Sequence, residues 1–199
     1  AYELAIIFKD GIQKMFVEQQ NYYYYITVTN ENYEQPEQPK GIEKDVIKGL
    51  YKVSSCTNPQ IRLLGSGAIL KESIAAQEVL KKYSINAEVW SATSFNLLRK
   101  DGMEAERYNQ LNPHKEKHTT HIDKCFGEHA IPVIATTDYM RAYADQIRPY
   151  IYSSYSVLGT DGFGRSDSRE ELREFFEIDA NHIVRLTAFT LHQESSISK

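Results

Sequence analysis

Residues 61–91, IRLLGSGAILKESIAAQEVLKKYSINAEVWS, carry the pattern that decides the fold. The apolar run at 61–64 has the length of a strand, and Gly65-Ser66-Gly67 follows it as a turn. Apolar residues then recur at helical spacing over 69–83, and 87–91 form a second strand. Because a helix of this length connects the two strands by a crossover, the pattern predicts that they pair in parallel.

The same alternation of strands and helices continues on both sides of this unit. The expected strands lie at 50–54, 131–135 and 155–158, and the expected helices at 43–48, 94–110, 119–126, 138–147, 168–176 and 180–193. The sequence therefore predicts an α/β fold, with a mostly parallel sheet covered by helices on both faces.

The first 42 residues have a different character. Residues 2–19 have the spacing of an amphipathic helix, and Tyr22–Val28 is an aromatic and β-branched run that predicts a strand. The tyrosines lack the interleaved basic residues that a nucleobase-stacking surface needs. Residues 30–42 are polar and hold two prolines and a glycine, so we expect a loop or linker there.

Composition excludes several classes of protein. The chain has 199 residues and a formal net charge of -4, which argues against general nucleic-acid binding. No apolar run is long enough to span a bilayer, and Cys56 and Cys125 are expected to be reduced thiols of an intracellular protein. The chain lacks an initiator methionine and a signal-peptide pattern, and we expect it to be a piece of something longer.

Two possible ligand sites have simpler interpretations. Gly65-Ser66-Gly67 lies where a dinucleotide turn would lie, but position 70 is leucine rather than the third glycine, so we expect an ordinary tight turn. His114, His118, His121 and Cys125 have the spacing of a zinc set only on one continuous helix. We expect solvated loop histidines instead, with Cys125 on the apolar side of the 119–126 helix beside Ile122 and Phe126.

The densest motif is LGTDGFGRSDSR at 158–169, between a strand and a helix that we expect Ser166 or Ser168 to cap. A loop at the carboxyl end of a strand is a common ligand position in α/β sheets, yet its residues equally suit a subunit interface, which we favour. Four charged residues here are expected to form a network: Asp161, Arg165, Asp167 and Arg169. The candidate site comprises Asp161, Gly162, Gly164, Arg165, Ser166, Asp167 and Arg169.

This loop resembles the signature near the end of the homodimeric-type pyruvate dehydrogenase first component, a thiamine-diphosphate enzyme. Five further segments are similar and occur in the family's order: 23–27 together with 30–33, then 63–67, 91–95, 99–102 and 137–140. The resemblance implies a transketolase-like C-terminal domain at 43–199, truncated at its end. It also implies that residues 1–42 are the closing helix and strand of the middle domain, followed by a linker.

The resemblance further implies a function. The full enzyme would decarboxylate pyruvate and transfer the acetyl unit to lipoyl groups of the dihydrolipoyl acyltransferase. It would use thiamine diphosphate and magnesium and act as a cytoplasmic homodimer with no nucleic-acid or membrane partner. The family's catalytic and metal-binding residues would lie upstream, so this segment is expected to bind no cofactor and to be inactive alone. Two alternatives remain: a related transketolase-group thiamine enzyme, or a stand-alone module that holds an anion between Arg165 and Arg169.

Overall fold

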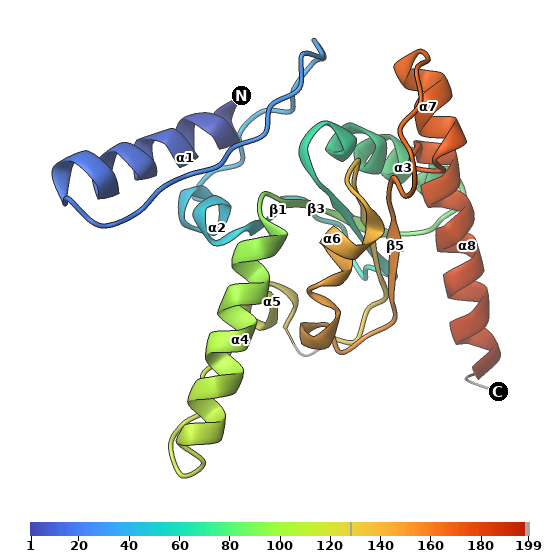
Figure 1. Cartoon of the computed structure of the whole chain (residues 1–199). Helices are drawn as coiled ribbons and strands as arrows, with labels where there is room; N and C mark the ends of the chain where they lie inside the picture. Colours follow the sequence, from blue (N-terminus) through green and yellow to red (C-terminus); the bar gives the residue numbers. More distant parts are fainter. Residues whose placement is uncertain (128, 198–199) are drawn as a thin grey trace.

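The computed structural model describes residues 1–127 and 129–197, and it contains a five-stranded sheet of order β1-β3-β2-β4-β5 (Figure 1). The strands are β1 (Leu50–Ser54), β2 (Ile61–Gly65), β3 (Ala87–Ala92), β4 (Val133–Thr136) and β5 (Tyr155–Leu158). β2 pairs in parallel with β3 and β4, and β4 with β5, whereas the edge strand β1 runs antiparallel to β3. The predicted mostly parallel sheet is confirmed.

Successive residues of the central strands point to opposite faces of the sheet, and each face has its own core. Leu63 of β2 and Val89 of β3 pack on the face covered by α3 (Leu70–Lys82) and α8 (Ala180–Ile197). Leu64 and Trp90, one position further along each strand, pack on the opposite face. That face is covered by α4 (Phe95–Leu111), α5 (His121–Phe126) and α6 (Arg141–Asp145). Helices therefore cover both faces, as the sequence predicts.

The remaining elements of the α/β body (residues 43–197) are short. α2 (Glu43–Lys48) precedes β1, α7 (Arg169–Phe175) precedes α8, and two 3-10 turns occupy Gly67–Ile69 and Arg148–Tyr150. Two helix starts are later than expected. α5 begins at His121 because Thr120 and Asp123 form a capping box, and α6 begins only at Arg141, after an extended Met140.

The N-terminal helix is confirmed as α1 (Tyr2–Ile12), which continues into a π-helical turn at Gln13–Val17. The strand expected at Tyr22–Val28 is wrong: the segment has no ladder partner in the described part of the chain, and it runs back along α1. The Tyr24 hydroxyl of this run donates a hydrogen bond to the Asp10 carboxylate of α1 at 2.6 Å. A strand propensity needs a neighbouring strand to bond with, and none is adjacent.

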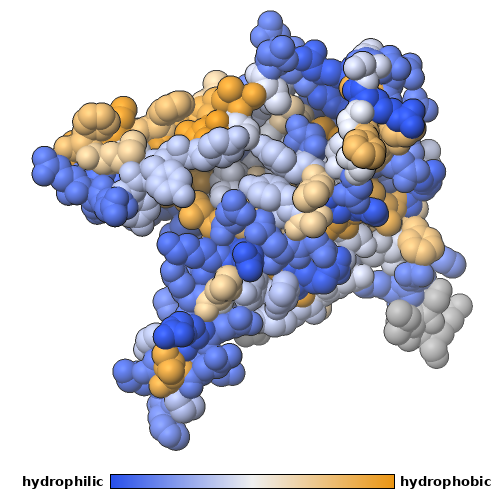
Figure 2. Space-filling model, in the orientation of Figure 1, coloured by the Kyte–Doolittle hydropathy of each residue, from blue (hydrophilic) through white to orange (hydrophobic). Residues whose placement is uncertain are grey.

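α1 contacts the body through its first turns and leaves much of its apolar surface open. Tyr2, Ile6 and Ile7 pack against Tyr51 and its buried neighbours in α2. Further along, the apolar side chains form an exposed band on α1 (Figure 2), and Phe16 is 74% exposed. Across the described residues, no helix combines the length and apolar character needed to cross a membrane.

Candidate functional site

The carboxyl ends of three parallel strands form the edge of the sheet at which the 158–169 loop begins. Ser66, just after β2, donates a backbone hydrogen bond to Thr136 of β4, and the Ser66 hydroxyl donates to Oγ1 of Thr137 at 2.8 Å. The Thr137 amide in turn donates to the carbonyl of Leu158, at the end of β5. The expected turn at Gly65-Ser66-Gly67 is thus tied to the neighbouring strand, with Gly67 at a φ of +54°.

The first part of the 158–169 loop is held closely against the chain that follows β4. A Cβ atom at Gly159 would lie 2.7 Å from the Tyr139 carbonyl oxygen, so only glycine fits there without a shift. The Thr160 amide donates to that same carbonyl at 2.8 Å. Asp161 accepts from the amide of Arg141 at 2.9 Å and from its Nε at 2.5 Å. These bonds, the backbone one first, lower the pKa of the Asp161 carboxyl.

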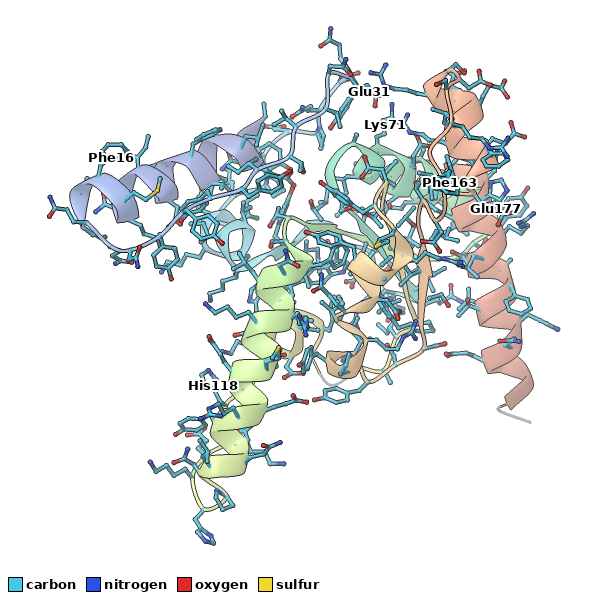
Figure 3. The ribbon with its side chains drawn as sticks, in the orientation of Figure 1. Phe16, Glu31, Lys71, His118, Phe163 and Glu177 are labelled. Carbon is cyan, nitrogen blue, oxygen red and sulfur yellow. The ribbon has the colours of Figure 1, made fainter. Side chains whose placement is uncertain are left out.

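The tip of the loop projects from the body. Gly162 has a φ of +82°, and no atom lies within 4 Å of a Cβ built on Gly162 or Gly164. Between them lies Phe163, labelled in Figure 3, which is 96% exposed. An aromatic ring presented in this way has no packing role within the described chain, so the tip is available for contact with another surface.

The last part of the loop leads into α7. Ser168 is the N-cap, because its side chain accepts from the Glu171 amide, while Ser166 lies exposed in the loop. Asp167 accepts from the Ser168 amide at 2.7 Å. The guanidinium of Arg165 lies 3.9 Å from the ring centroid of Phe175.

The expected charge network within the loop is therefore wrong. Each of the four charged side chains has a different partner: Asp161 bonds to Arg141, Asp167 caps locally, Arg165 stacks on Phe175, and Arg169 reaches the linker. The chain bends at 162–163 and again at 167, and each of these side chains contacts a group outside the set. Arg165 and Arg169 contact different groups, the Phe175 ring and the Asn30 side chain, and the anion-binding alternative stays a prediction.

A cluster of charges that the sequence did not predict lies where the linker crosses α3 and α7. Glu31 of the linker accepts from Arg173 Nη2 at 2.6 Å and pairs with the Lys71 ammonium group. Arg169 Nη2 donates to the Asn30 side chain at 2.7 Å. Hydrogen bonding by Arg173, followed by that of Lys71, lowers the pKa of Glu31 to about 2. No sequence signal marks Glu31, because it is one of several acidic residues in a polar stretch.

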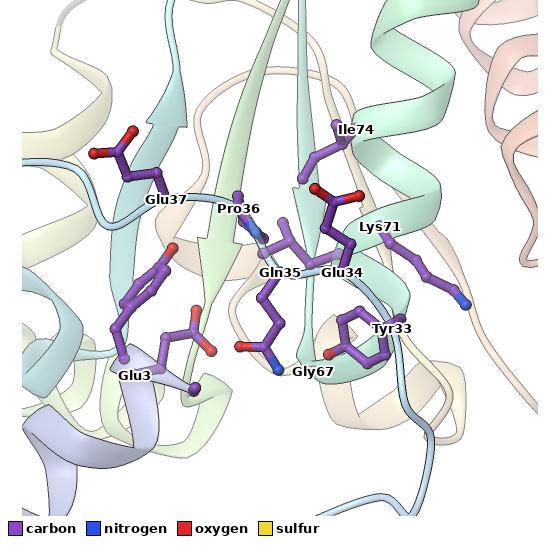
Figure 4. A pocket seen from close by; sticks show the side chains of 12 residues that line it. Glu3, Tyr33, Glu34, Gln35, Pro36, Glu37, Gly67, Lys71 and Ile74 are labelled. Atoms are coloured by element: carbon purple, nitrogen blue, oxygen red, sulfur yellow. The ribbon is translucent and has the colours of Figure 1, made fainter.

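An open hollow of about 360 Å³ lies beside this cluster, between the linker, α3 and the start of α1 (Figure 4). Tyr33 and Gln35 of the linker face Gly67 and Lys71 across it. Its charged lining consists of carboxylates and the Lys71 ammonium group, which already binds Glu31. The Lys71 ammonium group of this lining is therefore already paired with a carboxylate.

The histidines lie elsewhere in the molecule. His114 and His118 are exposed near the outer end of α4, where the ring of His118 packs edge-on against Tyr108 (Figure 3). His121 was expected to be solvated, which is wrong: it is 5% exposed and its Nε2 lies 2.8 Å from the Leu50 carbonyl oxygen. Burial at the start of α5 reflects the capping box, which turns the first residue of the helix inward.

Cys125 lies one turn after His121, with its sulfur 3.5 Å from the His121 Nε2. It packs with Ile122 and Phe126 against the core, as predicted, and burial raises the pKa of its thiol to about 12. Such a thiol stays protonated near neutral pH and does not act as a nucleophile. Among the described residues, no three or more His, Cys, Asp or Glu side chains are grouped so as to hold a metal ion.

Comparisons with known proteins agree with this architecture. A family model described as "Transketolase-like TK C-terminal domain" matches residues 49–179, and one described as "Pyruvate dehydrogenase E1 component middle domain" matches residues 1–36. A transketolase structure from Pichia stipitis, 19% identical, superposes with a TM-score of 0.59 over 84% of this chain and 21% of that chain. At this identity the likeness shows the fold alone.

Two curated relatives are much more similar in sequence, and both are named pyruvate dehydrogenase E1 component. The protein from Pseudomonas aeruginosa is 50% identical over 189 residues, covering 92% of this chain and 21% of the relative. The protein from Cupriavidus necator is 45% identical over 203 residues, covering 100% of this chain and 23% of the relative. The chain thus spans less than a quarter of the length of these relatives.

Proposed function

We propose a function from one premise: this chain belongs to the transketolase-like C-terminal domain family, whose model matches residues 49–179. It is the C-terminal part of a pyruvate dehydrogenase component. Residues 1–42 form the closing helix of the middle domain with its following extended segment and linker, and residues 43–199 form the transketolase-like domain. The observation that carries this proposal is identity of 45–50% to pyruvate dehydrogenase E1 components over 92–100% of the chain.

The full-length protein, on this proposal, decarboxylates pyruvate with thiamine diphosphate and magnesium and passes the acetyl unit to lipoyl groups of the dihydrolipoyl acyltransferase. The described residues do not themselves fit these cofactors. The linker carboxylate Glu31 is already neutralised by cations, and no group of three or more acidic, cysteine or histidine side chains that could hold a metal ion is present among them. We therefore assign no chemical step to residues of this chain, and we expect the segment alone to be inactive.

The role we propose for this segment is structural, and it includes contacts with a second copy. The contact loop comprises Asp161, Gly162, Gly164, Arg165, Ser166, Asp167 and Arg169, with Phe163 at its tip. Support comes from the geometry: both ends of the loop are bonded to the body while the tip exposes an aromatic ring. We further propose that the partners of the full-length protein are a second copy and the acyltransferase, and that it acts in the cytoplasm. Nucleic acid and membrane are not among the partners that we propose.

The activity is tested in the full-length protein that carries this sequence. With magnesium and thiamine diphosphate present, we expect it to release carbon dioxide from pyruvate, and omission of the coenzyme to abolish the release. The second candidate function is that of a related transketolase-group enzyme, because residues 49–179 match the transketolase-like C-terminal domain model. Turnover of a ketose phosphate without turnover of pyruvate would establish that candidate and refute ours.

The loop contact is tested with Arg165→Ala in the same protein. Loss of the guanidinium from the face of Phe175 frees the loop, so we expect weaker dimerisation or lower activity with an unchanged fold. Arg107→Ala, an exposed arginine of α4, is the matched control. Equal dimer mass and equal activity in both variants would show that the loop does not contribute to the dimer interface.

A further inference from the structure

Residues 27–31 contact Tyr139, against which the start of the 158–169 loop is held, and Arg169 at the end of the loop. At the first end, the Thr27 hydroxyl pairs with the hydroxyl of Tyr139, whose carbonyl accepts from the Thr160 amide. At the second end, Asn30 and Glu31 bind Arg169, the first residue of α7. Residues 27–31 therefore contact the loop directly at Arg169 and, through Tyr139, the segment that binds Thr160.

Glu31 is the best-anchored residue of this span. Its side chain is 10% exposed, and cations from two different helices, α3 and α7, converge on its carboxylate (Figure 3). Arg173 is equally buried, at 11% exposed, and also binds Glu72 of α3. Separating the Glu31 carboxylate from its cations would leave these nearly buried charges unpaired, which costs free energy. The ion pairs therefore hold the linker to α3 and α7.

The other contacts of the linker are weaker. Glu34, three residues further on, is exposed, and Thr27 and Arg169 are both exposed on the surface. Exposed pairs contribute little to stability, so the Thr27 and Arg169 contacts depend on the position that Glu31 gives the backbone.

We propose that residues 27–31 form a latch, closed by Glu31, that couples the N-terminal segment (residues 1–42) to the 158–169 loop. While the latch is closed, both ends of the loop are held and Phe163 is presented in one direction. When Glu31 leaves its cations, the start of α7 and the Thr160 region are released together. The latch is a conformational device and does not depend on the function proposed above.

Amide hydrogen exchange in the full-length protein tests this coupling. In Glu31→Gln the charge is lost while the shape is kept, and we expect exchange about tenfold faster both at residues 27–33 and at residues 160–172. The core strand at 61–65 should exchange as before. Glu34→Gln is the matched control, because it makes the same chemical change in the same linker, and it should leave both regions unchanged.

Two results would overturn the proposal. If Glu31→Gln speeds exchange only at 27–33, the linker is anchored there but the loop is not coupled to it. If Glu31→Gln and Glu34→Gln behave alike, Glu31 does not close the latch. Should Glu31→Gln fail to fold, Arg169→Gln decides the matter. This milder change removes the bonds to Asn30 and Glu31, and it should speed exchange about threefold in both regions. An effect confined to α7 would then refute the coupling.

Discussion

The α/β body (residues 43–197) and the N-terminal segment contain similar apolar side chains but bury them to different extents. In the body, Leu63 and Leu64 are fully buried on opposite faces of a sheet whose strands bond one another. In the N-terminal segment, Phe16 is 74% exposed, and Tyr23 and Tyr25 are each 88% exposed. Apolar periodicity therefore predicts an element, but the rest of the chain decides whether that element is buried.

The difference also concerns backbone hydrogen bonds. β2 has a parallel neighbour on each side, whereas Tyr22–Val28 is extended beside α1 without a strand partner among the described residues. The few bonds that hold the segment to the body are made by polar side chains. Glu3 accepts from Tyr51 and Ser91 at 2.7 and 2.6 Å, and Glu31 binds its cations. The segment is thus attached by these acidic residues together with the small apolar cluster that Tyr2, Ile6 and Ile7 form around Tyr51.

The largest effect should come from the core of the body. Leu64→Ala creates a cavity on a fully buried face, and we expect it to lower the free energy of unfolding by about 3 kcal/mol in chemical denaturation. Leu111→Ala is the control, because Leu111 is 66% exposed at the end of α4. A similar loss of unfolding free energy in both variants would contradict the placement of Leu64 in the core and Leu111 on the surface.

A smaller effect is expected where the loop meets the body. Gly159→Ala places a methyl group 2.7 Å from the Tyr139 carbonyl oxygen, and we expect a loss of about 2 kcal/mol in thermal unfolding. Gly164→Ala adds the same methyl group where nothing lies within 4 Å, and it should be neutral. Equal midpoints for the two variants would mean that the loop is not held at Gly159.

Acid should weaken the attachment of the N-terminal segment. The pKa of Glu31 is lowered from 4.5 to about 2, so the docked state favours the ionised carboxylate. Its contribution is fully present above about pH 4.5 and is lost as the pH falls toward 2. As the pH falls over this range, we expect the protection of residues 27–33, taken relative to the intrinsic exchange rate at each pH, to fall in the wild type but to vary less in Glu31→Gln. Identical pH profiles would show that another carboxylate governs the attachment.

The smallest effect on the unfolding free energy of the 199-residue chain should come from the exposed apolar face of α1 and the π-helical turn that follows it. Phe16→Ser removes little buried surface in the 199-residue chain, and it should change the unfolding free energy by less than about 0.5 kcal/mol. In the full-length protein we expect a loss of about 2 kcal/mol, which follows from our proposal that the rest of the middle domain covers this face. The same small value in both proteins would mean that the face stays open.

The sequence predicted the body well, because its signals are local. The apolar strands and helical periods of 61–91 are satisfied by neighbours within the chain, and Ser168 caps its helix with its own side chain. The resemblance to the pyruvate dehydrogenase family, carried by the 158–169 loop and five further segments, is confirmed by the relatives.

The predictions that failed depend on distant partners. Tyr22–Val28 has strand propensity but no adjacent strand, and the loop charges bind Arg141, Phe175 and the linker rather than one another. Glu31 was missed because its partners lie about 40 and 142 positions away along the chain. No spacing rule connects residues so far apart when one of them lies in a linker.

Amide exchange at residues 2–28, compared between the 199-residue chain and the full-length protein, tests the central claim most directly. If this segment is the edge of a domain completed by other parts of the protein, its amides should exchange at least about tenfold more slowly in the full-length protein. The strands at 61–65 and 87–92 should be protected equally in both. Equal exchange of residues 2–28 in the two proteins would contradict the account, because the exposed face of α1 would then be a free surface.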